Sequence, residues 1–328
     1  MSGVSVSIVT FDSARHLRAC LDSLAAQTEP PREVLVVDNA SLDDGATIAE
    51  RHAVVTRLFR NASNTGFAAG QNRAIREARG SWILTLNPDL VLAPTFLAEL
   101  GARVRALSDP PGVGRVGTLC GKLLRLRDDG RPVDPPVVDS TGIVFTREFR
   151  HLDRGSEQPD RGAWEREERV FGATAAAALY RREMIDDVSI DGEFFDEAFF
   201  AYREDADVAW RAQLLGWDCL YVPSAVGYHV RRVLPSNRRE LPAMLNRHSV
   251  KNRFLMRAKN VDGPVWRRCG WRGVARDLAV VGACVGWEWS SLPGLFEVAA
   301  SAGRLRRQRR EIQSRRRRPG SDIARWFA

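Results

Sequence analysis

Short apolar runs alternate with amphipathic stretches over the first 90 residues of the chain. The stretch 12–27 repeats apolar side chains at helical spacing, which predicts a helix with Asp12 or Ser13 as its N-cap. A later helix is predicted to close at Gly80, which we expect to be its C′ residue. The runs that predict strands are 4–10, 33–41, 54–59 and 81–90. Because they are apolar throughout, they predict an α/β fold whose mostly parallel central sheet carries helices on both faces.

The middle of the chain is less regular. Residues 106–170 are rich in Pro, Gly, Arg and Asp, so we expect a long, partly mobile segment over the site with one strand near residues 142–146. A helix is then predicted over residues 204–215, ended by Gly216. It is followed by an apolar run that predicts a strand ending near His229.

From Ser236 on, the sequence is rich in arginine and its apolar pattern predicts helices. We therefore predict a catalytic domain over residues 1–235 and a helical region over residues 236–328. The apolar run 278–287 is too short to span a bilayer. With Trp287, Trp289, Phe296 and the basic tail it is typical of a segment lying on an anionic membrane surface. A helical hairpin packed on the catalytic domain or on a second subunit explains it equally well, so a homo-oligomer stays open.

Charge is concentrated at the C-terminus. Residues 301–328 hold ten arginines and two acidic residues, and this excess of +8 equals the formal net charge of the whole chain. Such a tail suits anionic lipid, an acidic partner or nucleic acid. No nucleic-acid recognition motif accompanies it, so we expect no nucleic-acid partner.

Cysteine usage and the N-terminus indicate a compartment. The five cysteines are widely spaced and include no CxxC pair, so neither a disulfide framework nor a zinc site is predicted. The chain runs from Met1 almost directly into an apolar strand without a secretion signal. We expect a cytoplasmic protein, peripheral on the inner face of the cell membrane.

Carboxylates follow the predicted strands. Asp12, Asp38 and Asp89 each stand where an apolar run ends. In open sheets of this kind ligands lie outside the carboxyl ends of the strands. Three carboxylates on one edge repel one another unless a cation or a hydrogen-bonding ligand is present. This edge is the predicted site.

Six segments in this order resemble the inverting, GT-A-fold glycosyltransferases of family 2, in particular their rhamnosyltransferase-like branch. The segments are "SIVTFDSARHLRACLDSL", "VLVVDNASLDDG", "NTGFAAGQNRAI", "LTLNPDL", "FFDEAFFAYREDADVAWR" and "GYHV". The resemblance covers about residues 4–260. It implies a sheet-based nucleotide-sugar domain and transfer with inversion at the anomeric carbon.

The resemblance also implies a donor pocket. The backbone at Thr10 and Phe11 and the side chain of Asp12 would hold the nucleoside. Asp38 would accept the N3 hydrogen of a pyrimidine base, since a carboxylate favours uracil or thymine over cytosine. The other implied donor-pocket residues are Asn39, Asn64, Gly66, Gly70, Asn72, Asn87 and Glu204.

A metal and a base complete the implied site. Asn87 and Asp89 stand at the family's DxD motif, with asparagine in place of the first aspartate. Asp89 and His229 would be ligands of Mn²⁺ or Mg²⁺, which would bridge to the donor diphosphate. Asp205 corresponds to the general base that takes the proton of the acceptor hydroxyl.

The substrates are predicted less sharply than the reaction. The resemblance favours L-rhamnose from dTDP-L-rhamnose, with UDP-galactofuranose and UDP-GlcNAc as other donors. The expected acceptor is a hydroxyl of a lipid-linked glycan or a cell-surface polysaccharide. The alternative is a non-catalytic nucleotide-sugar-binding protein of the same fold, which the asparagine at position 87 favours.

Overall fold

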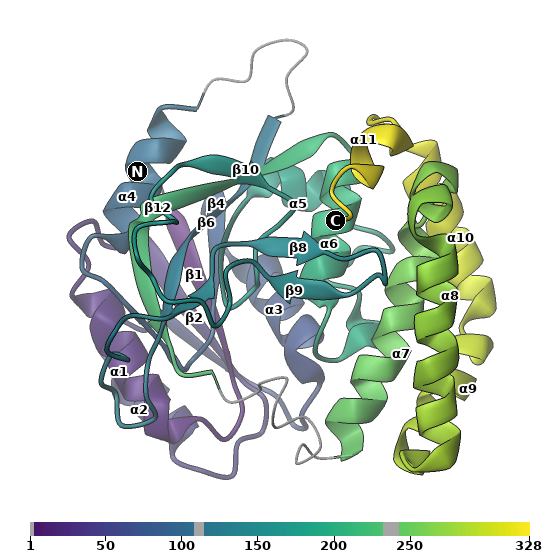
Figure 1. Ribbon diagram of the computed structural model, residues 1–328. Coiled ribbons are helices and arrows are strands. Elements are labelled where there is room, and N and C mark those ends of the chain that lie inside the picture. The colour runs from purple at the N-terminus through teal and green to yellow at the C-terminus, as the bar shows by residue number, and fades with distance from the viewer. Residues whose placement is uncertain (1–2, 108–114, 232–242) are drawn as a thin grey trace.

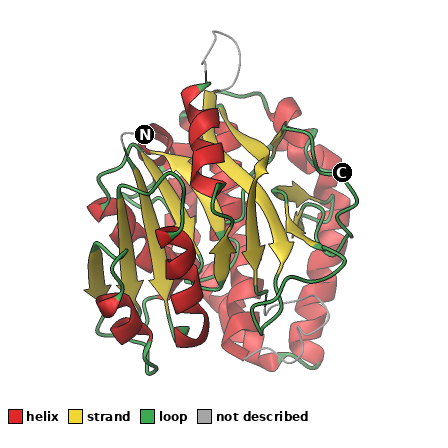
Figure 2. Ribbon diagram, turned by 90° about the vertical axis from the view of Figure 1, so that its left-hand side faces the viewer, coloured by secondary structure: helices red, strands yellow, loops and turns green. Residues whose placement is uncertain are grey.

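One mixed β-sheet runs through the molecule, with helices on both faces (Figures 1 and 2). The computed structural model describes residues 3–107, 115–231 and 243–328. The strand order along the sheet is β10-β12-β6-β11-β4-β1-β2-β3, with β5 paired to β12 and β7 to β6. The predicted α/β class is confirmed.

The parallel half of the sheet is the part that the sequence predicts directly. Its strands are β1 (Val4–Thr10), β2 (Glu33–Asp38), β3 (Arg57–Arg60) and β4 (Trp82–Leu86). All three pairings among them are parallel, and β1 lies between β2 and β4. Thr10 is opposite Asp38 in the register of β1 and β2. The carboxyl ends of these strands therefore meet at one edge of the sheet.

The other half of the sheet is mixed. Strand β11 (Ala177–Arg181) runs antiparallel to both β4 and β6, whereas β6 and β12 (Trp217–His229) are parallel to each other. The 11-residue β6 (Arg115–Arg125) lies inside the region predicted to be a long, partly mobile segment, so that prediction is wrong there. Glycines hide this strand: a Cβ at Gly121 would lie 2.1 Å from the carbonyl oxygen of Ala225 on β12. Close approach of the two strands thus requires a residue that weakens the apolar pattern.

Smaller elements complete this half. They are β5 (Leu90–Leu92), β7 (Val138–Ser140), β10 (Glu168–Val170) and a separate hairpin of β8 (Ile143–Phe145) and β9 (His151–Asp153). The strand predicted near residues 142–146 is confirmed as β8. The run 81–90 contains the end of one strand and the beginning of another, because the turn at Asn87–Asp89 separates β4 from β5.

Helices enclose the two faces of the sheet. One face is packed by α1 (Ala14–Ala25), α2 (Gly45–Arg51) and α4 (Phe96–Arg105), and the other by α3 (Gly66–Glu77), α5 (Arg182–Val188) and α6 (Glu204–Leu214). Helix α3 ends at Glu77, so Gly80 is not its C′ residue. Gly80 instead packs on β1, where a Cβ would lie 2.4 Å from the carbonyl oxygen of Gly3. Ser13 is the N-cap residue of α1 by position, although its side chain bonds to Phe11 and not to the helix.

The helices after residue 243 pack along one side of this core (Figure 1). They are α7 (Ala243–Asn260), α8 (Gly263–Gly286), α9 (Leu292–Ala300), α10 (Ala302–Ser314) and α11 (Gly320–Ala324). The boundary predicted at residue 235 lies outside the described residues. Phe327 is fully buried against Phe145 of β8. Among the described residues, no helix combines the length and the apolar character that crossing a membrane requires.

Candidate active site

A cleft of about 960 Å³ opens between the sheet, the β8–β9 hairpin and helices α7 and α8. Its lining includes five of the residues that the sequence predicts for the site. They are Asn87, Asp89, Glu204, Asp205 and His229. The structure therefore brings together the residues predicted to bind metal and to act as base, although they are up to 142 positions apart in the chain.

Asp89 and His229 face each other across the turn after β4 and the end of β12. Oδ1 of Asp89 lies 3.3 Å from Nε2 of His229. This oxygen is buried and makes no hydrogen bond of good geometry within the described part of the chain. Burial alone would lower the pKa of His229, but its hydrogen bond to Asp139 and the nearby carboxylate of Asp89 outweigh burial and raise the pKa to about 9. A cation at this position would have to displace the proton from Nε2.

Asp139 holds the other side of the same imidazole. Its Oδ2 lies 2.8 Å from Nδ1 of His229, and the side chain is almost fully buried. Carboxylates in this position orient the histidine of a metal site and fix its tautomer. Sequence reasoning missed Asp139, because the residue lies in the Pro-rich stretch "RPVDPPVVDS" that was interpreted as loop. Its only signal was an aspartate in a short apolar run.

The donor set fits a hard divalent cation that is completed by other ligands. One carboxylate oxygen is unsatisfied and one imidazole nitrogen points toward it. Within residues 3–107, 115–231 and 243–328, no group of three His, Cys, Asp or Glu side chains could hold a metal by itself. Mg²⁺ is commonly bound in this way, through one or two protein ligands plus substrate phosphates and water.

Asp205 and Glu204 begin helix α6 at the floor of the cleft. Oδ1 of Asp205 accepts from the N–H of Ala206 (2.7 Å) and Oδ2 from the N–H of Ala175 (3.3 Å). Burial and, secondly, the charge of Asp153 raise the pKa of Asp205 to about 6. The carboxylate is thus ionised at neutral pH but a stronger base than an ordinary aspartate.

Glu204 is the more deeply buried of the two. Burial, followed by the charge of Asp205, raises its pKa well above the usual value. Its Oε2 is buried and has no hydrogen-bond partner among the described residues. The raised pKa favours the protonated carboxylic acid, which is able to donate one hydrogen bond into the cleft.

The segment that leads into α6 has an unusual backbone. Phe200, Tyr202 and Arg203 all have positive φ, between 64° and 72°. Such residues persist only where their surroundings hold them. Nδ2 of Asn252, on α7, donates to the carbonyl oxygens of Phe199, Ala201 and Tyr202 at 2.8 to 2.9 Å. This single buried amide from the C-terminal region thus positions the loop that carries Asp205.

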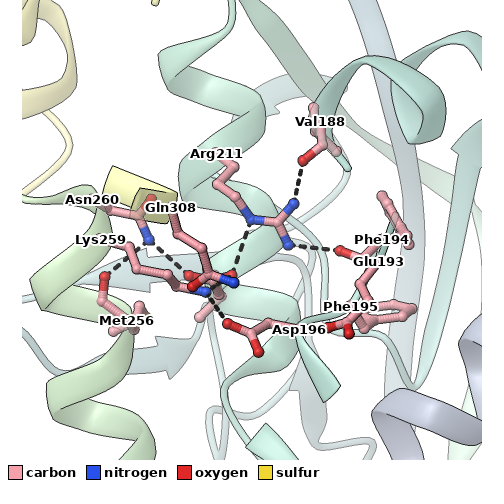
Figure 3. A network of polar contacts seen from close by, with 12 residues as sticks. Val188, Glu193, Phe194, Phe195, Asp196, Arg211, Met256, Lys259, Asn260 and Gln308 are labelled. Carbon is pink, nitrogen blue, oxygen red and sulfur yellow. Dashed lines mark hydrogen bonds and ion pairs between the residues drawn. The ribbon is translucent and has the colours of Figure 1, made fainter. Parts of the chain in front are cut away.

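A buried polar network ties the same region together (Figure 3). Nζ of Lys259 on α7 lies 2.6 Å from Asp196 and 2.9 Å from Asp207 of α6. Asp207 also accepts from Arg211, one helical turn later, as the i, i+4 spacing predicts. Burial alone would raise the pKa of Asp196, but Lys259 and then Arg304 of α10 hold it well below its usual value. Helices α7 and α10 are therefore part of the support of the base-bearing helix.

Most arginines of the C-terminal tail form ion pairs within the protein. Arg304, Arg307, Arg315, Arg316, Arg317 and Arg318 all form ion pairs with acidic residues of the protein. Their partners are Asp187, Asp191, Asp196, Asp218 and Asp262. More than half of the tail's ten arginines are thus paired within the protein, while its binding to anionic lipid or an acidic partner stays a prediction.

The residues predicted to hold the nucleoside lie at the ends of β1 and β2. Asp38 is 4% exposed, and the N–H of Asn39 donates to the carbonyl oxygen of Thr10 (2.9 Å). Asp12 has φ of 48° and accepts from the N–H of Leu42, while Phe11 is half exposed. Since neighbouring strands are about 4.8 Å apart, Asp38 on β2 lies two strands, about 10 Å, from the turn after β4, with the end of β1 between them. That separation suits a nucleotide with its base at β2 and its diphosphate at β4.

The residues of the "NTGFAAGQN" segment make internal contacts. The positive φ of Gly66 lets it approach Phe200, whose carbonyl oxygen accepts from the N–H of Ala68 at the start of α3. Gly70 packs on Val9, since a Cβ there would lie 2.9 Å from its methyl groups. Asn72 pairs with the backbone of Phe195, and Asn64 caps Gly66. A direct contact of these four residues with a donor stays a prediction.

Comparison with known proteins places this geometry among sugar-transferring enzymes. Residues 5–110 match the family described as "Glycosyl transferase family 2". The N-acetylglucosaminyl-diphospho-decaprenol L-rhamnosyltransferase of Mycobacterium tuberculosis is 30% identical over 245 residues, which cover 68% of this chain and 75% of that protein.

Solved structures share the fold at lower identity. The mannosyltransferase PcManGT of Pyrobaculum calidifontis, in complex with GDP-Man and Mn²⁺, is 19% identical with a TM-score of 0.52 and covers 95% of this chain and 84% of that chain. S. aureus TarS 1-349 in complex with UDP is 17% identical with a TM-score of 0.55, covering 95% and 88%. At these identities the likeness concerns the fold.

Proposed function

The chain belongs to glycosyl transferase family 2, and from this premise we propose that it transfers a sugar from a nucleoside diphosphate to an acceptor hydroxyl with inversion. The observation that carries the proposal is the shared cleft of Asp89, His229 and Asp205. Metal-ligating groups for a diphosphate and a base of pKa about 6 stand in one cavity that is large enough for donor and acceptor.

The reaction needs one proton acceptor and one displacement. Asp205 takes the proton of the acceptor hydroxyl as its oxygen bonds to the anomeric carbon, and the bond from that carbon to the donor diphosphate breaks. Attack from the face opposite the leaving group inverts the configuration. Burial raises the pKa of Glu204, and in its protonated form Oε2, which has no partner among the described residues, would donate a hydrogen bond to a sugar hydroxyl.

The leaving diphosphate carries the charge that the site must balance. We propose that Asp89 and His229 hold Mn²⁺ or Mg²⁺, with Asp139 orienting the imidazole. The bound ion would supply positive charge to the departing nucleoside diphosphate. Asn87 leaves the site with one carboxylate fewer than a DxD motif, so we expect metal affinity to be modest until the diphosphate completes the ligand shell.

L-rhamnose from dTDP-L-rhamnose is our first candidate for the donor. It is supported by the 30% identity to a rhamnosyltransferase. The diphospho-decaprenol in the name of that relative supports a lipid-linked glycan as acceptor. The buried carboxylate of Asp38 at the end of β2 supports a uracil or thymine base, which donates from N3.

The outer face of α8 supports a membrane-surface location. From Leu278 to Gly286 the exposed residues are apolar or glycine, and Trp271, Leu278 and Trp287 are 71%, 69% and 77% exposed. Such a face suits the boundary of lipid headgroups and acyl chains. Leu278→Asp should abolish sedimentation with phosphatidylglycerol vesicles while nucleotide-sugar binding is unchanged. Self-association of the wild type that Leu278→Asp removes, without vesicle binding, would show a subunit contact instead.

The activity is tested with a panel of donors. We expect UDP- or dTDP-sugars, but not GDP-sugars, to raise the melting temperature in the presence of Mn²⁺. Asp205→Asn should retain this shift and lose roughly 10²- to 10⁴-fold in nucleoside diphosphate release. The matched control is Asp186→Asn, an exposed aspartate outside the cleft. Unchanged turnover by Asp205→Asn would refute the assigned base, and donor binding without turnover on any acceptor would favour a non-catalytic protein.

A further inference from the structure

One part of the cleft, which we call its α8 end, is lined by arginines. It lies between the hairpin turn at residues 146–150 and helices α7 and α8. The contact of these parts is close, since a Cβ at Gly273 of α8 would lie 2.5 Å from the ring of Phe149. The lining residues here include Arg150, Leu152, Leu245, Arg253, Arg276 and Val280.

Positive charge is in excess at this end. Asp277 is shared by Arg253 (2.8 Å) and Arg257 (2.6 Å), and Glu148 lies 3.7 Å from Arg272. Arg150 and Arg276 line the cleft as well, and neither forms an ion pair within the described ranges 3–107, 115–231 and 243–328. Five arginines therefore face two carboxylates. The side chains of Arg150 and Arg276 are exposed and able to reach a ligand.

The charge of these arginines is already felt by their neighbours. Burial lowers the pKa of His151 well below its usual value, and the charges of Arg203, Arg231 and Arg150 lower it further. His151 thus stays neutral and does not add to the positive charge. Burial, although opposed by Asp277, also lowers the pKa of Arg253, and Arg257 and Arg276 contribute to the same direction. A ligand that brings negative charge to this end would relieve that repulsion.

We propose that Arg150 and Arg276 form a subsite for the diphosphate of a lipid-diphosphate acceptor. This inference rests on the proposed function and assigns the acceptor side of the same cleft. A diphosphate diester carries two negative charges, and arginine binds phosphate oxygens through paired N–H groups. Leu152, Leu245 and Val280 beside the arginines give the first carbons of a lipid chain apolar contacts. The acceptor sugar would then extend along the cleft toward Asp205.

The subsite is tested with farnesyl diphosphate as the probe. Binding to the full-length protein is measured in EDTA, so that no cation can bridge the diphosphate to Asp89 and His229. The double variant Arg150→Gln/Arg276→Gln should weaken binding by about tenfold or more, because two charge-assisted contacts are lost. Both side chains are exposed, so the fold should survive, and an unchanged unfolding midpoint verifies this. Arg276→Lys should retain part of the affinity.

The matched control removes the same charge elsewhere. Arg306→Gln/Arg310→Gln changes two exposed arginines of α10 that lie outside the cleft, and should leave farnesyl diphosphate affinity unchanged. Equal weakening by the two double variants would mean an unspecific charge effect and would overturn the subsite. So would competition by farnesol as strong as that by farnesyl diphosphate. Weakened binding to phosphatidylglycerol vesicles with unchanged binding of farnesyl diphosphate would assign the arginines to the membrane surface and also overturn it.

Failure of the subsite is distinguishable from failure of the proposed function. Nucleotide-sugar binding with Mn²⁺, and slow hydrolysis of the donor by water, should be the same in Arg150→Gln/Arg276→Gln as in the wild type. If the wild type binds no nucleotide-sugar, the proposed function fails while the farnesyl diphosphate assay still reports on the arginines. If donor binding is normal and the double variant binds farnesyl diphosphate as the wild type does, only the subsite is refuted.

Discussion

The buried network around Lys259 leads to a prediction about stability. Two substitutions that each remove one charge should lower the free energy of unfolding by different amounts. The network holds three cations, Lys259, Arg211 and Arg304, and two carboxylates, Asp196 and Asp207. Lys259→Met leaves two cations and two carboxylates, so each carboxylate keeps one cation. Asp207→Asn leaves three cations with one carboxylate. The second change therefore strands positive charge in a site that is 0% exposed at Lys259 and Asp207.

The magnitudes follow from the contacts. Lys259→Met removes two charge-assisted hydrogen bonds of 2.6 and 2.9 Å but replaces a buried ammonium by an apolar side chain of similar length. We expect a loss of about 2–3 kcal/mol in the free energy of unfolding, below the full cost of orphaning a buried charge. Asp207→Asn turns an amide N–H₂ toward Lys259 and Arg211, which both donate to Oδ2, or toward the amide of Asn260 at Oδ1. In either case one buried cation is left without its carboxylate, which costs about 3–5 kcal/mol. We therefore expect the Lys259→Met variant to be more stable than Asp207→Asn by about 1–2 kcal/mol in the free energy of unfolding.

Urea unfolding followed by circular dichroism measures both values by linear extrapolation. Arg307→Met is the control. It removes one positive charge of α10 from an exposed ion pair with Asp191, and it should leave the unfolding midpoint unchanged. A Lys259→Met variant that is less stable than Asp207→Asn would refute the charge-balance argument. So would a result in which both resemble the control, because the network would then contribute nothing to stability.

Three further predictions concern the site. Because the pKa of Asp205 is about 6, kcat/KM should fall about tenfold per pH unit below pH 6, and Asp153→Asn should move this acidic limb to lower pH by removing a neighbouring negative charge; an unmoved limb would contradict the role of Asp153. Asp139→Asn should weaken Mn²⁺ binding by about 10- to 100-fold in titration calorimetry, since the imidazole of His229 loses its orienting carboxylate, whereas unchanged affinity would exclude His229 as a ligand. Asn252→Ala should lower kcat with little change in KM for the donor, because the loop before Asp205 loses its three-carbonyl clamp; a change in donor KM alone would contradict a positioning role.

The parallel half of the sheet could be predicted because its strands are uniform apolar runs separated by amphipathic helices. The mixed half could not, since β6 carries glycines and a buried Lys122 where it meets its neighbours. Lys122 satisfies its charge on Asp160 and Glu165, which are far away in the sequence. A lysine in a strand indicates an exposed position unless such partners are known. Strand β6 could therefore not be predicted from its own residues, because the ion pairs of Lys122 are made with residues far away in the sequence.

The same reason explains which site residues could be predicted. Asp89, Asp205 and His229 follow recognisable elements, so a resemblance locates them. Asp139 acts only through His229, and Asn252 only through the backbone of residues 199–202. Their contribution depends on contacts between segments 50 to 90 residues apart, which no local pattern contains. The pairing of the tail arginines could not be predicted for the corresponding reason, since their acidic partners lie on α5, in the loop after it, at the start of β12 and at the N-cap of α8.

The two ends of the cleft differ in charge, and this difference affects the orientation in which an acceptor enters. The metal and base end carries Asp89, Asp205 and Asp153 beside Arg231 and His229 and is the proposed place of the donor diphosphate, whereas the α8 end carries Arg150 and Arg276. An acceptor with a diphosphate at one end and a free hydroxyl at the other meets attraction in one orientation and repulsion in the other. With the diphosphate at the arginines, the neutral sugar hydroxyl is the part that faces Asp205, as proton transfer requires. In the reverse orientation the acceptor diphosphate would meet the donor diphosphate proposed to lie at Asp89 and His229, and these like charges would repel each other in a partly desolvated cavity. The arginine end would therefore contribute to the orientation of the acceptor as well as to its affinity, and the loss of Arg150 and Arg276 should lower kcat/KM for a lipid-diphosphate acceptor more than for a neutral sugar.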